Sequence, residues 1–123
     1  MLKFRYYDED EKLDRAWYDS TNIVYSECED KENDFKVLYV VFKNGAMYKY
    51  KAVNVHDYLL FMVGGLDGSN GKALNKYIKP KCECECVGNV DVSQLFGKME
   101  YYKKLKDEKE LSKSKNNSEN TEK

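Results

Sequence analysis

The sequence lacks long apolar runs and contains a single proline, Pro80, and a single histidine, His56. No window of about 18 apolar residues is present, which argues against a membrane-spanning helix. The first residues, Met1 to Arg5, lack the apolar stretch of a signal peptide. We therefore expect a protein with no membrane partner that works in the cytoplasm, or in the host cytoplasm if a phage encodes it.

A strong basic excess is also missing, because the formal net charge of the 123 residues is −1. Residues 1–34 carry five Lys/Arg against eleven Asp/Glu, whereas residues 35–88 carry eight against four. A protein that holds a long polyanion usually has many more cations, since each neutralised phosphate adds salt-dependent affinity. The composition therefore favours a smaller anionic ligand over a long nucleic acid.

The sequence shows no sign of a metal centre. Without a secretory signal, its four cysteines are expected to be reduced thiols. Three of them alternate with glutamate at positions 82, 84 and 86, as on one face of a strand. Such positions lie about 7 and 14 Å apart, whereas zinc thiolates converge at about 2.3 Å from one ion. We therefore predict no metal ligands and no cofactor. The three cysteines are expected to form a stripe of small buried side chains packed against a helix.

Catalytic motifs are equally absent. His56 and Asp57 are neighbours at the start of an expected helix, where adjacent residues do not face each other. No serine or cysteine nucleophile motif accompanies them. We therefore predict no catalytic residues and a protein that is not an enzyme.

A β-hairpin dominates the middle of the chain. Residues 35–42 are apolar at all but one position, which predicts an inner strand. Asn44-Gly45 is a typical hairpin turn, and a second strand follows in which Tyr48 and Tyr50 alternate with lysine. Residues 23–28 read as a strand that precedes this hairpin.

Helical patterns follow the hairpin. Val55, Tyr58, Leu59 and Met62 form an amphipathic stripe, with Asn54 as its N-cap and a stop at Gly64-Gly65. A second short helix begins near residue 72 and ends before the proline. Residues 81–87 alternate as a further strand, and a third helix spans residues 91–106.

These elements predict an α+β fold: a small antiparallel sheet of three to five strands, packed by two short helices, plus a C-terminal helix. We expect an N-terminal strand and acidic turn in residues 1–16, an α+β domain in 17–88, an amphipathic helix in 89–106 and a disordered tail in 107–123. The apolar stripe of the third helix, with Phe96 and Met99, closes the core or makes a subunit contact. A homo-oligomer is expected.

Several short motifs appear in an order that resembles the KTSC domain. They are Ser20-Thr21-Asn22-Ile23, the hairpin ending in Tyr48-Lys49-Tyr50, Tyr58-Leu59-Leu60, and the segment from Ser69 to Lys79. The resemblance covers about residues 17–85. That family is a small module at the C-terminus of some lysyl-tRNA synthetases and a stand-alone protein in bacteria and phages, and it implies this fold with a suspected role in RNA binding. In size and composition the chain is also similar to phage sponge proteins that sequester cyclic nucleotide alarm signals.

Two groups of residues are candidates for a ligand site. Tyr48 and Tyr50 share one strand face about 7 Å apart, a spacing suited to stacking on bases, although both could instead pack in the core. The second group is the glycine-rich loop from Leu66 to Gly71 and the start of the helix that follows it. This segment could bind a phosphate, or Ser69 or Asn70 could simply cap the helix. The residues that we assign to the ligand are Tyr48, Tyr50, Ser69, Asn70, Gly71, Lys72, Asn75, Trp17 and Asn22. Trp17 could equally cover one end of the sheet.

The leading hypothesis is a non-catalytic protein that captures a small phosphorylated nucleotide, such as a cyclic dinucleotide immune signal, as a phage anti-defence sponge does. An RNA- or tRNA-binding module is the alternative. A third hypothesis is a protein-interaction inhibitor that uses the acidic segment from Asp8 to Asp14 as its contact surface.

Overall fold

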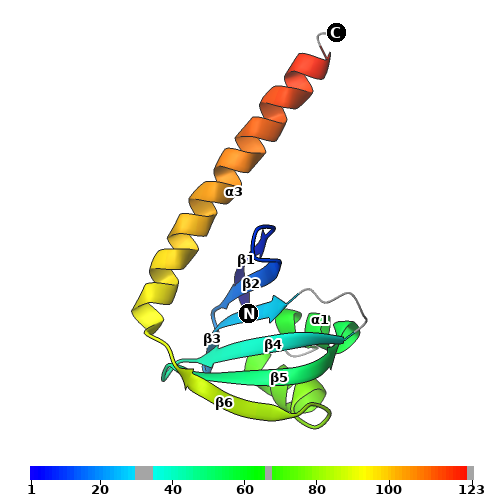
Figure 1. Cartoon of the computed structure of the whole chain (residues 1–123), viewed down its shortest axis with the longest axis vertical. Coiled ribbons are helices and arrows are strands. Elements are labelled where there is room, and N and C mark those ends of the chain that lie inside the picture. Colours follow the sequence, from blue (N-terminus) through cyan, green and yellow to red (C-terminus); the bar gives the residue numbers. More distant parts are fainter. Residues whose placement is uncertain (30–34, 66–67, 122–123) are drawn as a thin grey trace. The chain divides into compact units, whose positions relative to one another are not determined.

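The computed structural model describes residues 1–29, 35–65 and 68–121 (Figure 1). The chain forms two compact units, Met1–Val92 and Ser93–Lys123. The first unit contains a six-stranded antiparallel sheet in which each strand pairs with the next one along the chain. Its strands are β1 (Leu2–Asp8), β2 (Leu13–Tyr18), β3 (Ile23–Glu29), β4 (Phe35–Phe42), β5 (Ala46–Asn54) and β6 (Cys84–Asn89). The α+β class agrees with the sequence prediction, but the sheet has more strands than the predicted three to five.

The strand that was not predicted is β2, at the N-terminal side of the predicted domain. β1 pairs with β2 along almost its whole length, from Leu2 opposite Tyr18 to Asp8 opposite Leu13. The expected boundary between residues 16 and 17 therefore lies inside β2. Residues 1–16 belong to the same sheet, because their aromatic residues alternate with charged ones as in a half-buried strand.

The central hairpin forms as predicted. Gly45 in the turn has φ +91°, a left-handed conformation that favours glycine. A Cβ atom at this position would lie 2.7 Å from the Val90 carbonyl oxygen, so the close approach of the two backbones also requires glycine. The Asn44 side chain accepts a hydrogen bond from the Ala46 N–H at 3.0 Å and closes the turn.

Three short helical segments accompany the sheet in this unit: α1 (Val55–Val63), α2 (Asn70–Ala73) and the π-helix η1 (Leu74–Ile78). The Asn54 side chain caps α1 by accepting from the His56 N–H, and Gly64 ends the helix with φ 84°, both as predicted. The buried face of α1 differs from the expected stripe. It consists of Tyr58, Phe61 and Met62, whereas Val55 and Leu59 are 41% and 44% exposed.

The core lies between one face of the sheet and these helices. It is built from alternate strand residues and from the buried sides of the helices, since strand side chains point to opposite faces in turn. Its members are Ala16, Tyr18, Ile23, Cys28, Leu38, Val40, Tyr50, Val53, Tyr58, Phe61, Met62, Leu74 and Ile78. The prediction of a buried first hairpin strand is confirmed for Leu38, Val40 and Val41.

The second unit is the long helix α3 (Val92–Thr121), which includes the predicted third helix and continues through most of the predicted disordered tail. Lysine and glutamate are good helix formers, so a polar sequence can stay helical without an apolar stripe. One ion pair along the helix, Lys103 to Glu100 at 3.7 Å, fits this explanation. None of the helices in the described part of the chain is long and apolar enough to cross a bilayer.

Candidate functional site

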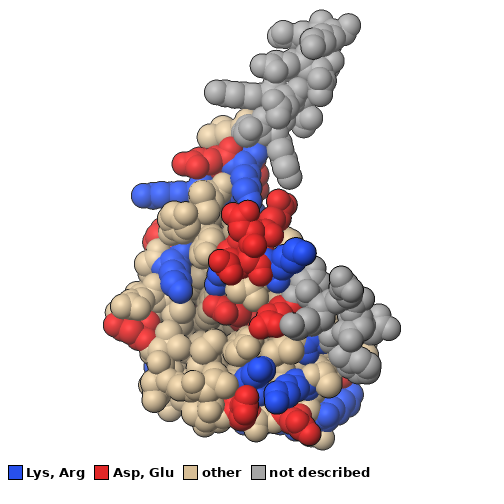
Figure 2. Space-filling model, in the orientation of Figure 1, with Lys and Arg blue, Asp and Glu red and all other residues tan. Residues whose placement is uncertain are grey.

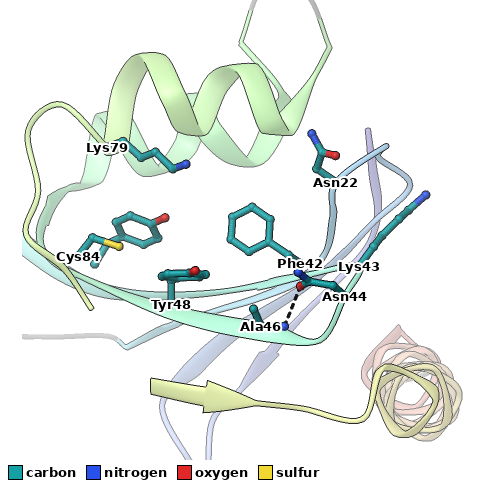
Figure 3. A pocket seen from close by; sticks show the side chains of 9 residues that line it. Asn22, Phe42, Lys43, Asn44, Ala46, Tyr48, Lys79 and Cys84 are labelled. Carbon is teal, nitrogen blue, oxygen red and sulfur yellow. Dashed lines mark hydrogen bonds between the residues drawn. The ribbon is translucent and has the colours of Figure 1, made fainter. Parts of the chain in front are cut away.

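A cavity of about 480 Å³ opens within the Met1–Val92 unit, beside the turn of the β4–β5 hairpin. We call it the Tyr48 pocket. Three aromatic rings, two lysines, two asparagines, an alanine and a thiol line it: Asn22, Phe42, Lys43, Asn44, Ala46, Tyr48, Tyr50, Lys79 and Cys84 (Figure 3). This volume falls within the range of about 300–1,000 Å³ that is typical of small-molecule sites.

The sheet register brings the aromatic and thiol side chains together. Tyr48 and Tyr50 lie two residues apart on β5 and therefore share one face. Tyr50 pairs with Cys84 of β6, so the thiol stands beside the tyrosine on the same face. Phe42, the last residue of β4, completes the row of rings near the hairpin turn.

The rings and one lysine form a compact cluster. The Phe42 and Tyr48 rings meet edge to face, with centroids 5.5 Å apart and an interplanar angle of 88°. Lys79, just after η1, holds its Nζ atom 5.9 Å from the centroid of the Phe42 ring, within cation–π range. Figure 3 shows the Lys79 side chain reaching across the pocket above the rings, whereas Lys43 extends away from them.

The remaining wall carries hydrogen-bonding groups. Asn22 is held in place through its backbone, because its carbonyl oxygen accepts a hydrogen bond from the Lys43 N–H at 2.8 Å. Burial and a hydrogen bond with Cys84 raise the pKa of Tyr50 well above its usual value. Tyr50 is fully buried, so it belongs to the core beneath the cavity.

The charge of the lining is one-sided. Lys43 and Lys79 contribute two cations, and no carboxylate is found among the described residues that line the cavity. On the face of the molecule shown in Figure 2, by contrast, Lys/Arg and Asp/Glu side chains are interspersed. The Tyr48 pocket is thus a local cationic site, and this view shows no extended basic surface.

Only part of the predicted ligand-binding set lines this pocket, namely Tyr48, Tyr50 and Asn22. Trp17 does not. It is 1% exposed, and its ring packs 4.8 Å from Tyr25 and 5.6 Å from Phe4. The strand β2 directs the indole into this aromatic cluster, so its ring faces are covered by the protein itself.

Asn70 is a structural residue and is fully buried. Its Nδ2 donates to the backbone carbonyls of Phe61 and Met62 at 2.9 and 3.0 Å. Its Oδ1 accepts from the Met1 amino group at 2.7 Å. These bonds give Asn70 a structural role: it adds a donor to the Phe61 carbonyl, which also accepts from the Gly64 N–H at 3.1 Å, and it satisfies the Met62 carbonyl near the end of α1.

The other predicted residues around the second helix lie outside the lining. The Ser69 hydroxyl accepts a hydrogen bond from the Lys72 N–H at 3.3 Å and caps α2, so the capping interpretation is correct for this residue. A Cβ atom added to Gly71 would lie 3.4 Å from Asn22 Nδ2, which places this glycine behind the pocket wall. Lys72 and Asn75 are exposed and do not line the cavity.

The residues assigned to a small ligand from the sequence did not include Phe42, Lys43, Asn44, Lys79 or Cys84, although Lys79 is one of the lysines expected to contact RNA in the alternative hypothesis. The hairpin register could have suggested Phe42 and Asn44, since both flank a turn that was predicted correctly. Lys79 had no such signal, because its position depends on how η1 packs over the sheet.

The third hypothesis uses the acidic segment from Asp8 to Asp14 as a contact surface, but the two residues at its ends are buried. Asp8 and Asp14 are 8% and 7% exposed, and each forms an ion pair with arginine, Arg15 and Arg5 respectively. Residues 9–12 between them are exposed. Only this short turn is open to a partner.

Metal coordination finds no support in the described part of the chain, where no group of three or more His, Cys, Asp or Glu side chains could hold an ion.

No protein-family model matches the chain, and comparison with curated proteins finds no match. The resemblance to the KTSC domain therefore stays a prediction from short motifs.

Proposed function

We propose that the protein is a non-catalytic binding protein that captures a small phosphorylated nucleotide in the Tyr48 pocket. The observation that carries this proposal is the position of Lys79, whose ammonium group lies over the Phe42 ring in a cavity that Tyr48 and Tyr50 also line. This arrangement offers a cation and flat apolar surfaces within the reach of one small molecule.

The rings suit the base of such a ligand. Stacking of a base on an aromatic side chain contributes about 1–3 kcal/mol and tolerates any base. Tyr48 is half-buried and lies at the cavity surface. Its ring is already fixed by the edge-to-face contact with Phe42, so little side-chain entropy is lost when a base stacks on it.

The lysines suit the phosphate. A lysine ammonium acts as a mobile point charge that can follow a phosphate group, and two of them in one lining match a ligand with one or two phosphates. The asparagine amides of Asn22 and Asn44 can bond to sugar or base edges. A cyclic dinucleotide immune signal is one member of this ligand class, and its capture as a phage anti-defence sponge is the biological role that we propose.

Cysteine protection tests the proposal directly, because Cys84 lines the pocket and Cys86, on the same strand, does not. Both thiols are exposed. Variant C82S/C86S keeps Cys84, and variant C82S/C84S keeps Cys86 as the matched control. We would measure the rate of maleimide labelling of each variant with a panel of nucleoside monophosphates, cyclic mononucleotides and cyclic dinucleotides.

A bound nucleotide should slow the labelling of Cys84 at least about fivefold and that of Cys86 clearly less, since Cys86 pairs with Tyr48 but lies outside the cavity lining. Equal rates with every nucleotide at millimolar concentration would overturn the proposal. Protection of Cys84 by single-stranded RNA and by none of the nucleotides would overturn the proposal in favour of the RNA-binding alternative. Sedimentation of the same samples measures the homo-oligomer that we propose as the working form.

A further inference from the structure

The Tyr48 pocket contains a polar group of fixed orientation, the side-chain amide of Asn44 at the hairpin turn. Asn44 Oδ1 accepts a hydrogen bond from the Ala46 N–H at 3.0 Å, which a dashed line marks in Figure 3. The backbone N–H can donate only to the amide oxygen and not to the NH2 group, so this bond settles which amide atom faces the backbone. Asn44 is exposed, and its Nδ2 makes no hydrogen bond within the described residues. The two N–H groups of Nδ2 are therefore open to a ligand.

The other charged and backbone groups of this lining also favour a ligand rich in acceptors. Lys43 and Lys79 can only donate hydrogen bonds, and the described residues of the lining include no carboxylate. The backbone carbonyl oxygen of Asn22 already accepts from the Lys43 N–H at 2.8 Å. Phosphate oxygens provide acceptors for the lysines, and the edge of a base can provide them for Asn44.

The two purine bases differ at the edge that carries the N7 atom. Guanine presents two acceptors there, N7 and O6, whereas adenine presents the acceptor N7 and a donor, the 6-amino group. An asparagine with both amide atoms free pairs with adenine, because its oxygen accepts from the amino group while its nitrogen donates to N7. The turn holds the oxygen of Asn44, so this residue offers N–H groups to the pocket instead of that donor–acceptor pair.

We infer that the Tyr48 pocket selects guanine nucleotides over adenine nucleotides, with Asn44 as the residue that determines the preference. This inference rests on the proposed function, since it names the base of the nucleotide captured there. The place of Asn44 supports it. Asn44 follows Phe42 by two residues and lines the same cavity, so a base stacked on the Phe42–Tyr48 pair can reach the amide with its edge. In the adenine complex, the 6-amino group would instead meet N–H donors and lack an acceptor.

The test titrates two matched pairs of nucleotides into the full chain by calorimetry: GMP with AMP, and cyclic di-GMP with cyclic di-AMP. The guanine member of a pair should bind at least about tenfold more tightly than the adenine member. IMP has the N7 and O6 atoms of guanine without the 2-amino group, so it should bind as GMP does. Equal affinities within the pair that binds, or IMP binding like AMP while GMP binds more tightly, would overturn this inference alone. A failure of all five ligands to bind would overturn the proposed function as well.

Two variants with the same change of charge identify the residue responsible. Asn44→Asp replaces the N–H donors by a second oxygen, can still accept from the Ala46 N–H, and forms Asp-Gly, which suits a hairpin turn as Asn-Gly does. It should weaken every nucleotide through its charge and also remove the preference for guanine. Asn22→Asp adds the same charge to the same lining, so it should weaken both members of a pair and leave their ratio unchanged. A preference that survives in Asn44→Asp, or one that is lost in Asn22→Asp, would overturn the assignment to Asn44.

Discussion

Tyr58 on α1 donates a hydrogen bond of 2.7 Å to Asp14 on β2, and so joins the helical layer to the first hairpin of the sheet. Both residues are almost fully buried. Asp14 also receives the Arg5 guanidinium, so the carboxylate connects α1, β1 and β2 at one point. A single buried carboxylate therefore fixes the relative position of elements that are 44 residues apart in the sequence.

Tyr58→Phe should lower the free energy of unfolding by about 1.5–3 kcal/mol, because it removes a buried hydrogen bond to a charged group. Urea denaturation monitored by circular dichroism measures this change. Tyr101→Phe is the matched control, since Tyr101 is 58% exposed on α3. A Tyr58→Phe variant as stable as the wild type would show that the Arg5 bonds alone are sufficient for Asp14.

Alkaline pH should unfold the protein. Burial raises the pKa values of Tyr18, Tyr25, Tyr50 and Tyr58 above the ordinary value of 10.0. The unfolded chain loses these protons near pH 10 while the folded chain retains them, so the associated stability is complete below pH 10 and is lost as the pH rises above it. Each such tyrosine contributes about 1.4 kcal/mol per pH unit in that range.

Absorbance of tyrosinate near 295 nm, recorded together with circular dichroism, measures this transition. We expect the buried tyrosines to ionise in one cooperative step with unfolding. Independent, gradual ionisation of all eleven tyrosines while the fold persists would contradict the burial of these hydroxyls.

Asn70→Ala should destabilise the protein by about 1–3 kcal/mol, because the Met62 carbonyl loses its donor while the Phe61 carbonyl keeps its hydrogen bond from the Gly64 N–H. Asn75→Ala on the neighbouring π-helix should change the stability by less than about 0.5 kcal/mol, since Asn75 is exposed. Thermal unfolding of both variants measures the difference. Equal, small effects would restore Asn70 as a candidate for ligand binding.

Asn70 and Asn75 show which features of the structure could be predicted from the sequence and which could not. Local signals were sufficient for the hairpin at Asn44-Gly45 and for the caps Asn54, Gly64 and Ser69, because turn and cap chemistry depends on a few neighbouring residues. The burial of Asn70 and the position of Lys79 depend on how helices pack over the sheet. No residue within a few positions records that packing, so no local signal showed that Asn70 is buried or that Lys79 lines a cavity.

The rotation of α1 was missed for the same reason. The 3.6-residue period of apolar residues predicted the helix correctly. The helix has two apolar sides, however, and the sequence alone does not show which of them is buried: its apolar residues include Val55, Tyr58, Leu59 and Phe61. Contact with the sheet selects Tyr58 and Phe61. Val55 and Leu59, on the other side, remain 41% and 44% exposed.

Ala52→Gly should stabilise the protein by about 1 kcal/mol. Ala52 has φ 56°, which costs an L-residue about 1–2 kcal/mol and costs glycine almost nothing. The residue lies in β5 at an irregularity where the pairing with β4 shifts its register. Thermal unfolding measures the gain, and Ala46→Gly in the same strand should instead be destabilising. A loss of stability in Ala52→Gly would mean that the side chain contributes packing that outweighs the strain.

Lys79→Met tests whether the cation in the Tyr48 pocket binds a phosphate. Methionine keeps an apolar chain of similar length but removes the charge, so affinity for the nucleotide found by cysteine protection should fall about tenfold or more. Lys76→Met is the matched control, because Lys76 also holds its Nζ near a ring, 5.3 Å from the Tyr77 centroid, but lies outside the cavity. Affinity would be measured by calorimetry.

Repeating the titration at two salt concentrations separates a small nucleotide from RNA. A ligand bound by two lysines should show a shallow salt dependence of its affinity. A polyanion bound along the surface should show a steep one, which both substitutions would reduce about equally. Equal effects of the two substitutions would therefore favour RNA over a small nucleotide as the ligand.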